Sequence, residues 1–433
     1  MNRRKFGEAT LLGIGSAALL TPASLLAAPP AELGSNTTSH IGVTSLGPDS
    51  SPSDGSADAI EEGNGADLEV RVVRTIEITS SCRYCWFPTV HRLANGAIMA
   101  TMRMSPDEIN PEGDFSAYCI SEDGGLTWSR RYTMGAGANV DGAWSSLPQK
   151  DGRIWQLYSW LTPYPEGQNE RFHGILTKFG KGGTEIEQAR DAVISLSRAV
   201  QMAPTQLFGR RGGDGLLRKQ AIALPWGPII EGLNGDLIAL LYYATGRDSR
   251  KYRLILMRSS DDGKTWTEFS TVASVEPNGK PWPWMGKEGP CEAGLVRLDD
   301  KRLYVIFRTG ADGFMGQTWS SDDGKTWSLP TSTSYKGVAP RIRRLSNGVL
   351  ACTYGRPGPV TIMFSVDGTG KKWSHITPIF SGMSTRYTDF IEVAPGRLFM
   401  VYDSVPYGWD PIPESDTISK NTIYAKVIEV QKV

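Results

Sequence analysis

Three arginines follow apolar stretches of the chain at nearly the same position. Arg103 follows AIMATM, Arg308 follows RLYVIF, and Arg356 follows VLACTYG. A guanidinium group presents a planar fork of N–H donors, which binds a carboxylate, sulfate or phosphate through two parallel hydrogen bonds. If the three stretches are equivalent strands of a repeated unit, the arginines converge on one anion-binding surface. The alternative is three unrelated surface arginines, which the shared offset disfavours.

Each of these arginines ends a predicted β-hairpin, and six such hairpins recur along the chain. Each consists of two apolar strands around a turn such as N-G, D-G, D-D or P-G. The turns lie near residues 95, 151, 235, 300, 348 and 395. The interval between the second and third turns is longer than the others. We therefore expect an insertion there, including a helix-like stretch at residues 182–200.

Four of the hairpins are followed by another apolar strand and then by a short polar string. The strings are SEDGGLTW, SSDDGKTW twice, and the looser SVDGTGKKW, beginning at residues 121, 259, 320 and 365. Ser and Asp side chains bond the amides of a tight turn, and Gly takes the positive φ that a Cβ disfavours. The string therefore favours a structural role over a calcium or ligand site. A period of this size is typical of a β-propeller, whereas two packed sandwiches would not repeat a fixed motif.

These strings resemble the Asp boxes of the sialidase (neuraminidase) superfamily, which repeat S-x-D-x-G-x-T-W. The resemblance covers about residues 72 to 430. It implies an all-β, six-bladed propeller whose blades are four-stranded antiparallel sheets with Asp-box turns. It also implies a glycan substrate and no cofactor or metal.

The resemblance implies roles for residues in two of the hairpins. Glu292 opens the hairpin that Arg308 ends, and Tyr387 lies just before the last hairpin, as in the sialidase pattern. Tyr387 would then be the nucleophile and Glu292 its base. A neutral phenol suits an anomeric carbon that bears a carboxylate, because an anionic nucleophile would be repelled.

The remaining implied roles fall on the loop after the first hairpin and on the arginines. The general acid would be Asp107 or, in reserve, Asp114, because both follow Arg103 in that loop. Arg308, Arg356 and Arg103 would bind the substrate.

One position departs from the sialidase pattern. The first hairpin of the family begins with an Arg-Ile-Pro motif, and Trp86 stands here in place of that arginine. Arg83 or Arg386 could replace it. Trp86 could instead stack on the face of a sugar, so it counts among the predicted substrate-binding residues.

Three functions fit these observations. The first is a secreted exo-glycosidase of the sialidase type that removes a terminal acidic sugar with retention of configuration. The second is a hydrolase or lyase for another sugar, uronic, sulfated or neutral, on the same scaffold. The third is a non-catalytic propeller that binds glycans or proteins.

Composition narrows the possible partners. The chain has 433 residues, with 46 basic against 46 acidic side chains, so no global field favours nucleic acid or an anionic membrane. Five cysteines leave at least one thiol unpaired within a chain, and the four histidines do not have metal-ligand spacing. The oligomeric state stays open.

The N-terminus has the pattern of an export signal. Arg3-Arg4 precedes a weakly apolar stretch and small residues near Ala28, which is typical of a twin-arginine signal. The predicted divisions are an export signal at 1–28, a disordered linker rich in Ser, Gly and Asp at 29–67, and the propeller at 68–433. We expect a periplasmic or extracellular protein that is not inserted in the membrane after export.

Overall fold

The computed structural model consists of β-strands, turns and loops in the part of the chain that it describes. The described residues are 67–105, 115–133, 145–149, 153–157, 162–163, 170–179, 186–200, 202–204, 219–221, 223–244, 251–275, 282–410 and 412–433. These residues include no helix, so none that is long and apolar enough to cross a bilayer. All the described strands belong to the unit formed by residues 58–433.

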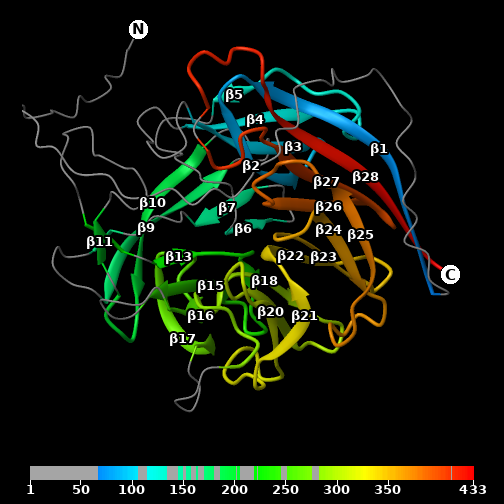
Figure 1. Cartoon of the computed structure of the whole chain (residues 1–433). Helices are drawn as coiled ribbons and strands as arrows, with labels where there is room; N and C mark the ends of the chain where they lie inside the picture. Colours follow the sequence, from blue (N-terminus) through cyan, green and yellow to red (C-terminus); the bar gives the residue numbers. More distant parts are fainter. Residues whose placement is uncertain are drawn as a thin grey trace, which may run out of the picture. The chain divides into compact units, whose positions relative to one another are not determined.

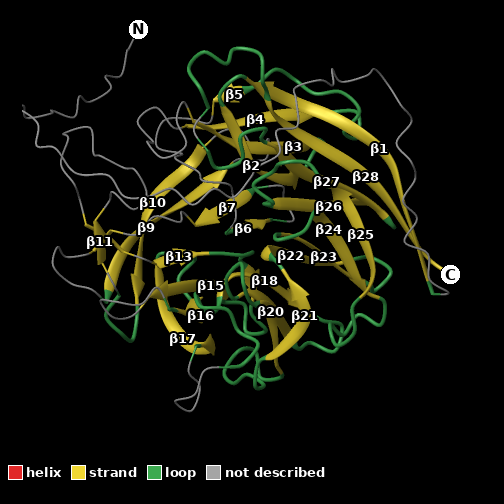
Figure 2. Ribbon diagram, in the orientation of Figure 1, coloured by secondary structure: helices red, strands yellow, loops and turns green. Residues whose placement is uncertain are grey.

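Four antiparallel sheets of this unit have four strands each (Figures 1 and 2). Three of them are continuous in sequence: β2 (Tyr84–Arg92), β3 (Ile98–Ser105), β4 (Phe115–Ser121) and β5 (Tyr132–Thr133); β18 (Cys291–Arg297), β19 (Leu303–Arg308), β20 (Phe314–Ser320) and β21 (Thr331–Lys336); and β22 (Val338–Arg344), β23 (Leu350–Gly355), β24 (Val360–Ser365) and β25 (Ser374–Phe380).

The fourth sheet joins the two ends of the described chain. It has the order β1-β28-β27-β26 and contains β1 (Leu68–Ser81), β26 (Thr388–Ala394), β27 (Arg397–Ser404) and β28 (Asn421–Lys432). The antiparallel ladder between β1 and β28 runs from Leu68 opposite Lys432 to Ser81 opposite Asn421. The strand that opens the fold therefore completes the sheet that closes it.

The largest sheet has ten strands and consists of two antiparallel groups. One contains β6 (Ser146–Pro148), β7 (Ile154–Leu157), β8 (Thr162–Pro163), β9 (Arg171–Phe179) and β10 (Ile186–Ser195). The other contains β13 (Ala223–Pro225), β14 (Ile230–Glu231), β15 (Leu237–Ala244), β16 (Tyr252–Ser259) and β17 (Thr265–Ser274). The groups meet through a parallel pairing of β10 with β17 that begins at Val193 opposite Thr265. A separate pair joins β11 (Met202–Pro204) and β12 (Lys219–Ala221).

Strand β10 corrects the expectation of a helix-like stretch at residues 182–200. Its ladder with β9 places Ile194 opposite Phe172. Ala192, Ile194 and Leu196 are buried, which is the alternation of a strand and not the periodicity of a helix. Pairing on both edges of β10 supplies its backbone hydrogen bonds and overrides the local helix propensity.

All six predicted hairpins are present as antiparallel strand pairs. They are β2–β3, β6–β7, β14–β15, β18–β19, β22–β23 and β26–β27. The first strands β18, β22, β26 and β2 contact one another in that order, and β15 contacts β18. Figure 1 shows these first strands near the middle of the unit, with β17, β21, β25 and β1 on its outside. The ends of the first strands therefore meet in one region.

The polar strings form the same turn at three positions and a longer variant of it at the fourth. In the third copy the Ser320 hydroxyl donates to Asp322 at 2.8 Å, and the Gly324 amide donates to the Ser320 oxygen at 2.8 Å. Asp322 also accepts the amide of Thr326 at 2.9 Å and its hydroxyl at 2.6 Å. Gly324 has a φ of 87°, which a side chain would disfavour. The strings therefore close turns of the fold, as their residue types predict.

Candidate active site

The inner strands depart from regular geometry where they approach one another. The ladder of β2 shifts register after Trp86, that of β18 shifts around Glu292, and that of β22 shifts around Ala339. Phe87, Glu292 and Ala339 have φ values of 53°, 20° and 47°. Such bulges re-aim single side chains and are common next to active sites. The three bulges therefore direct residues of three sheets toward one buried site.

Glu292 stands in the bulge of β18 and is 6% exposed. Its Oε1 accepts hydrogen bonds from the Tyr387 hydroxyl at 2.6 Å and from Nη1 of Arg308 at 2.9 Å. Its Oε2 accepts the amide of Ala339 at 3.1 Å. The carboxylate is therefore held by donors from three sheets, with one oxygen directed at the phenol.

Tyr387 lies immediately before β26 and is 8% exposed. Phe87 meets its ring edge-on at 5.1 Å and Trp226 at 6.0 Å between centroids. Burial, together with the charge of Glu292, raises the pKa of Tyr387 well above its ordinary value. The phenol is therefore neutral at neutral pH, and Glu292 is placed to accept its proton.

Arg308 and Arg356 both lie beside this pair. Arg308 bonds Glu292 through Nη1 and Glu288 through Nη2, each at 2.9 Å. The Arg356 guanidinium carbon lies 5.3 Å from the centroid of the Tyr387 ring. Two positive groups therefore flank the phenol, and both lower its pKa against the larger effect of burial.

Arg103 reaches the aromatic side of the site. It stands opposite Trp86 in the ladder of β2 and β3, and its guanidinium carbon lies 5.8 Å from the Trp86 ring centroid. Trp86 itself is 1% exposed and stacks on Tyr84 with centroids 4.4 Å apart. Where the sialidase pattern has an arginine, this chain therefore has a buried aromatic cluster.

One of the two candidate replacements for that arginine, Arg386, is engaged elsewhere through its side chain. Arg386 donates from Nη1 to the carbonyl of Phe380 at 2.9 Å. Arg83 forms hydrogen bonds through its backbone. Its amide donates to Ser81 Oγ at 3.2 Å, and its carbonyl accepts from Asn421 at 3.2 Å.

The predicted general acids, Asp107 and Asp114, lie outside the described residues. One further acid was missed, although its position could have revealed it. Asp403 ends the last hairpin where other hairpins carry Arg308 or Arg356. It is fully buried, and it accepts the amide of Thr385 at 2.8 Å and that of Phe87 at 3.1 Å. Asp403 thereby ties the segment before Tyr387 to the bulge of β2.

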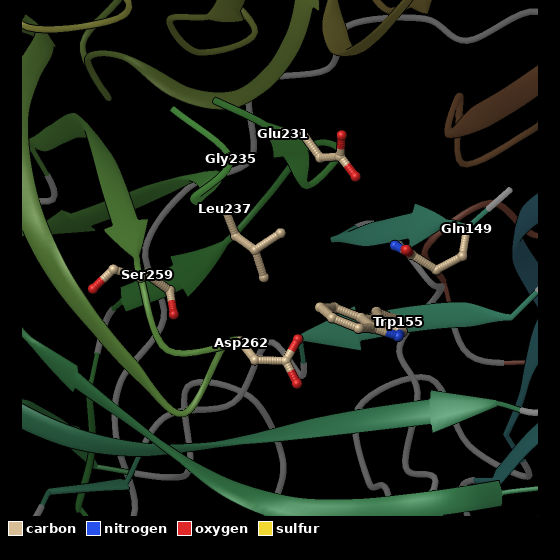
Figure 3. Close-up of a pocket in the computed structure, with 8 residues that line it drawn as sticks. Gln149, Trp155, Glu231, Gly235, Leu237, Ser259 and Asp262 are labelled. Atoms are coloured by element: carbon tan, nitrogen blue, oxygen red, sulfur yellow. The ribbon is translucent and has the colours of Figure 1, made fainter. Parts of the chain in front are cut away.

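Two cavities lie apart from this pair. Figure 3 shows one of about 210 Å³ between Trp155, Glu231 and Asp262, where Asp262 is paired with Lys178 at 2.7 Å. The second, of about 220 Å³, is lined by Arg341, Arg343 and Asp389 among others. Neither is lined by Tyr387 or Glu292. Hydrogen bonds among Tyr387, Glu292 and Arg308 define the candidate active site.

Known proteins share sequence or structural similarity with this chain. Residues 211–403 match the BNR repeat-like domain family. A protein of unknown function from Dyadobacter fermentans has a similar structure, with a TM-score of 0.61 and 20% identity, covering 84% of this chain and 99% of the other. No curated protein matches the chain.

Two similar structures carry the names of glycosidases. The Hadza microbial sialidase Hz136 matches with a TM-score of 0.55 and 14% identity, over 86% of this chain and 75% of its own. The α-L-arabinofuranosidase Arb93A from Fusarium graminearum matches with a TM-score of 0.50 and 13% identity, over 83% and 98%. At these identities the likeness establishes the fold alone.

Proposed function

The chain has the fold of the sialidase superfamily, with a BNR repeat-like domain at residues 211–403, and from this premise we propose that it is a retaining glycoside hydrolase. Tyr387 is the nucleophile and Glu292 is its base. The observation that carries the proposal is the 2.6 Å hydrogen bond from the buried phenol to the buried carboxylate. A base within hydrogen-bond reach of a weak nucleophile is the arrangement that covalent catalysis needs.

In the first step, the Tyr387 oxygen bonds to the anomeric carbon while the bond to the leaving oxygen breaks. The phenolic proton passes to Glu292, and Asp107 or Asp114 protonates the leaving oxygen. In the second step, water attacks the anomeric carbon and gives a proton to the same aspartate, while the Tyr387 oxygen departs and takes its proton back from Glu292. Two displacements at one carbon restore the starting configuration.

The site also supports this chemistry electrostatically. Arg308 and Arg356 stabilise negative charge on the phenolic oxygen as it forms, since both lower the pKa of Tyr387. Burial keeps the same group protonated at rest. The nucleophile is therefore generated only when Glu292 takes its proton.

The sugar is a separate question from the reaction type. The resemblance to sialidases implies a terminal acidic sugar, whose carboxylate Arg308 and Arg356 would hold. A different sugar on the same site is the second candidate. The observation that favours it is the buried Trp86 in place of an arginine.

We also infer that the sheets form six blades. Four sheets are separate, and the two groups of the ten-stranded sheet supply the others. The parallel contact between β10 and β17 then joins the outer strands of neighbouring blades. Residues 1–28 would export the folded protein, so that it acts on glycans outside the cytoplasm.

The decisive experiment traps the intermediate. The protein is incubated with fluorinated glycosyl fluorides of uncharged sugars and with 2,3-difluoro sialic acid, and the labelled peptide is sequenced by mass spectrometry. We expect the label on Tyr387. A label on Glu292, or product of inverted configuration by NMR, would contradict the proposal.

A further inference from the structure

The fork of Arg308 is already occupied by protein carboxylates. Nη1 bonds Glu292 and Nη2 bonds Glu288, each at 2.9 Å, while the Arg308 side chain is only 11% exposed. A substrate carboxylate binds an arginine best through two parallel N–H donors. To offer them, Arg308 would have to release a partner that is itself negatively charged, and Glu292 is needed for the reaction.

Arg356 is held in a similar way. Its Nε and Nη2 donate to the carbonyl of Thr385 at 3.2 and 2.9 Å, so this edge of the guanidinium faces the backbone. Its flat face is also covered, because its guanidinium carbon lies 5.3 Å from the Tyr387 ring and 5.2 Å from the Trp409 ring. The third arginine of the sialidase pattern is replaced by Trp86.

The charges nearest the phenol are paired with one another. Among the described residues that contact Tyr387 or share the ion pairs of Arg308, Arg308 and Arg356 are positive, and Glu288 and Glu292 are negative. A further carboxylate brought into this buried environment would compete with Glu288 and Glu292 for these arginines. Removing an unpaired charge from water is costly, whereas an uncharged ring incurs no such cost.

One aromatic side chain of the site remains available to a ligand. Trp409 is 43% exposed, although Trp86 and Phe87 beneath it are 1% and 6% exposed. Its ring lies 5.5 Å from Trp86 and 5.7 Å from Phe87, so it is backed by packed aromatic rings. A partly exposed indole that is supported by buried rings offers apolar surface to the C–H groups of a sugar.

We propose that the sugar which reacts with Tyr387 carries no charge, and that the exposed indole of Trp409 is the surface on which it stacks. This inference rests on the proposed hydrolase function and specifies its substrate class. Arg356 lies beside both Trp409 and Tyr387 and holds them in position, and Arg308 orients Glu292. Neither arginine serves as a clamp for a substrate carboxylate.

The test is a panel of 4-methylumbelliferyl glycosides that share one leaving group. It contains α- and β-linked uncharged hexosides and pentosides, the sialoside and the glucuronide. We expect turnover only among the uncharged members. Trp409→Ala should lower kcat/KM on the best of them by 10-fold or more, mainly through KM. Leu329→Ala, an equally apolar change at a residue that is 67% exposed, should leave both constants unchanged.

A second variant tests the occupied fork directly. Glu288→Gln removes the negative charge opposite Arg308 Nη2 and should strengthen the binding of free sialic acid at least fivefold, measured by calorimetry against the unaltered protein. Unchanged binding would mean that Arg308 is not limited by Glu288 and would count against the inference.

The outcomes separate this inference from the proposed function. If the sialoside is the best substrate and Tyr387→Phe abolishes its turnover, the charge inference is wrong and the hydrolase stands. If an uncharged glycoside is turned over equally well by Tyr387→Phe, the proposed function fails. If no uncharged member is turned over or bound, or if Trp409→Ala behaves like Leu329→Ala, the inference is overturned.

Discussion

The phenolic oxygen of Tyr387 lies 2.6 Å from a carboxylate oxygen of Glu292, although 95 residues separate the two in the chain. Each residue comes from the edge of a different sheet, and Arg308 from the second strand of the Glu292 hairpin completes the contact at 2.9 Å. The pair combines a buried proton donor with a buried acceptor. That combination underlies the catalytic proposal.

Replacing the phenol tests the nucleophile. Tyr387→Phe keeps the ring packed against Phe87 and Trp226 but removes the hydroxyl oxygen that attacks in the proposed mechanism. We expect kcat to fall by more than about 10³-fold on any glycoside that the protein hydrolyses, with little change in melting temperature. Tyr132→Phe is the control, because Tyr132 is 39% exposed and lies outside the site. Retained turnover in Tyr387→Phe would remove Tyr387 from the mechanism.

Asp403 is expected to hold the segment that carries Tyr387. Its carboxylate accepts the Ser384 hydroxyl at 2.8 Å, the Thr385 amide and hydroxyl, and the Phe87 amide. Asp403→Asn replaces one acceptor with an NH₂ group that faces N–H and O–H donors. We expect a loss of about 2 to 3 kcal/mol in the free energy of unfolding, together with a lower kcat.

The control for Asp403 is Asp416→Asn. Asp416 also accepts several donors, including the amides of Ile418 and Ser419 at 2.9 and 2.8 Å, but it lies in a partly exposed loop where water can replace it. Urea unfolding should show a much smaller effect there. Equal losses in the two variants would argue against a special role for Asp403.

The polar strings should affect stability and not substrate recognition. Asp322→Ala removes the acceptor of the Ser320 hydroxyl and of the Thr326 amide and hydroxyl. We expect a loss of roughly 1 to 2 kcal/mol in unfolding free energy, with KM unchanged. Asp300→Ala, in a hairpin turn outside the strings, provides the comparison. A changed KM in Asp322→Ala would point to a binding role for the strings.

His91 should make the fold sensitive to mild acid. It is 2% exposed, and burial lowers its pKa from 6.5 to about 4. The negative charge of Asp389 raises this pKa, whereas the positive charges of Arg343 and Arg341 lower it further. Because the unfolded chain binds the proton more tightly, stability is lost as pH falls from about 6.5 to 4. The loss approaches roughly 3 kcal/mol.

This pH dependence can be assigned with one variant. Asp389 has a lowered pKa, so protonation of its carboxylate reduces the stability of the fold only as the pH falls below the usual carboxyl range. This loss therefore occurs at lower pH than the loss caused by His91. His91→Gln should therefore flatten the unfolding free energy between pH 6.5 and 4. An unchanged slope would assign the acid sensitivity to other groups.

Export is tested by changing the paired arginines. Arg3 and Arg4 lie outside the described residues, and their role rests on the sequence pattern. Replacing both by lysine keeps the positive charge but removes the twin-arginine pattern. We expect the protein to accumulate in the cytoplasm, measured by fractionation and immunoblotting. Unimpaired export would indicate a different route.

The sequence by itself determined the repeated architecture, because the relevant signals are local. The turn residues of six hairpins and the Ser-Asp-Gly strings specify nearby hydrogen bonds and positive φ angles. The same period aligned Arg308 with Arg356 and pointed to Glu292 and Tyr387 through the resemblance. It did not predict β10, since pairing with β9 and β17 decides whether that stretch becomes a strand.

Only the tertiary structure decided which residues of the site contact one another. Whether Arg308 faces a substrate or Glu288, and whether Trp86 is exposed or buried under Trp409, depends on contacts between sheets that no local pattern encodes. The bulge at Glu292 also has no signal in residue type, because it arises from the register of β18 against β19. Local chemistry thus specified the strands and turns, and packing among distant strands set the orientation and charge balance of the site.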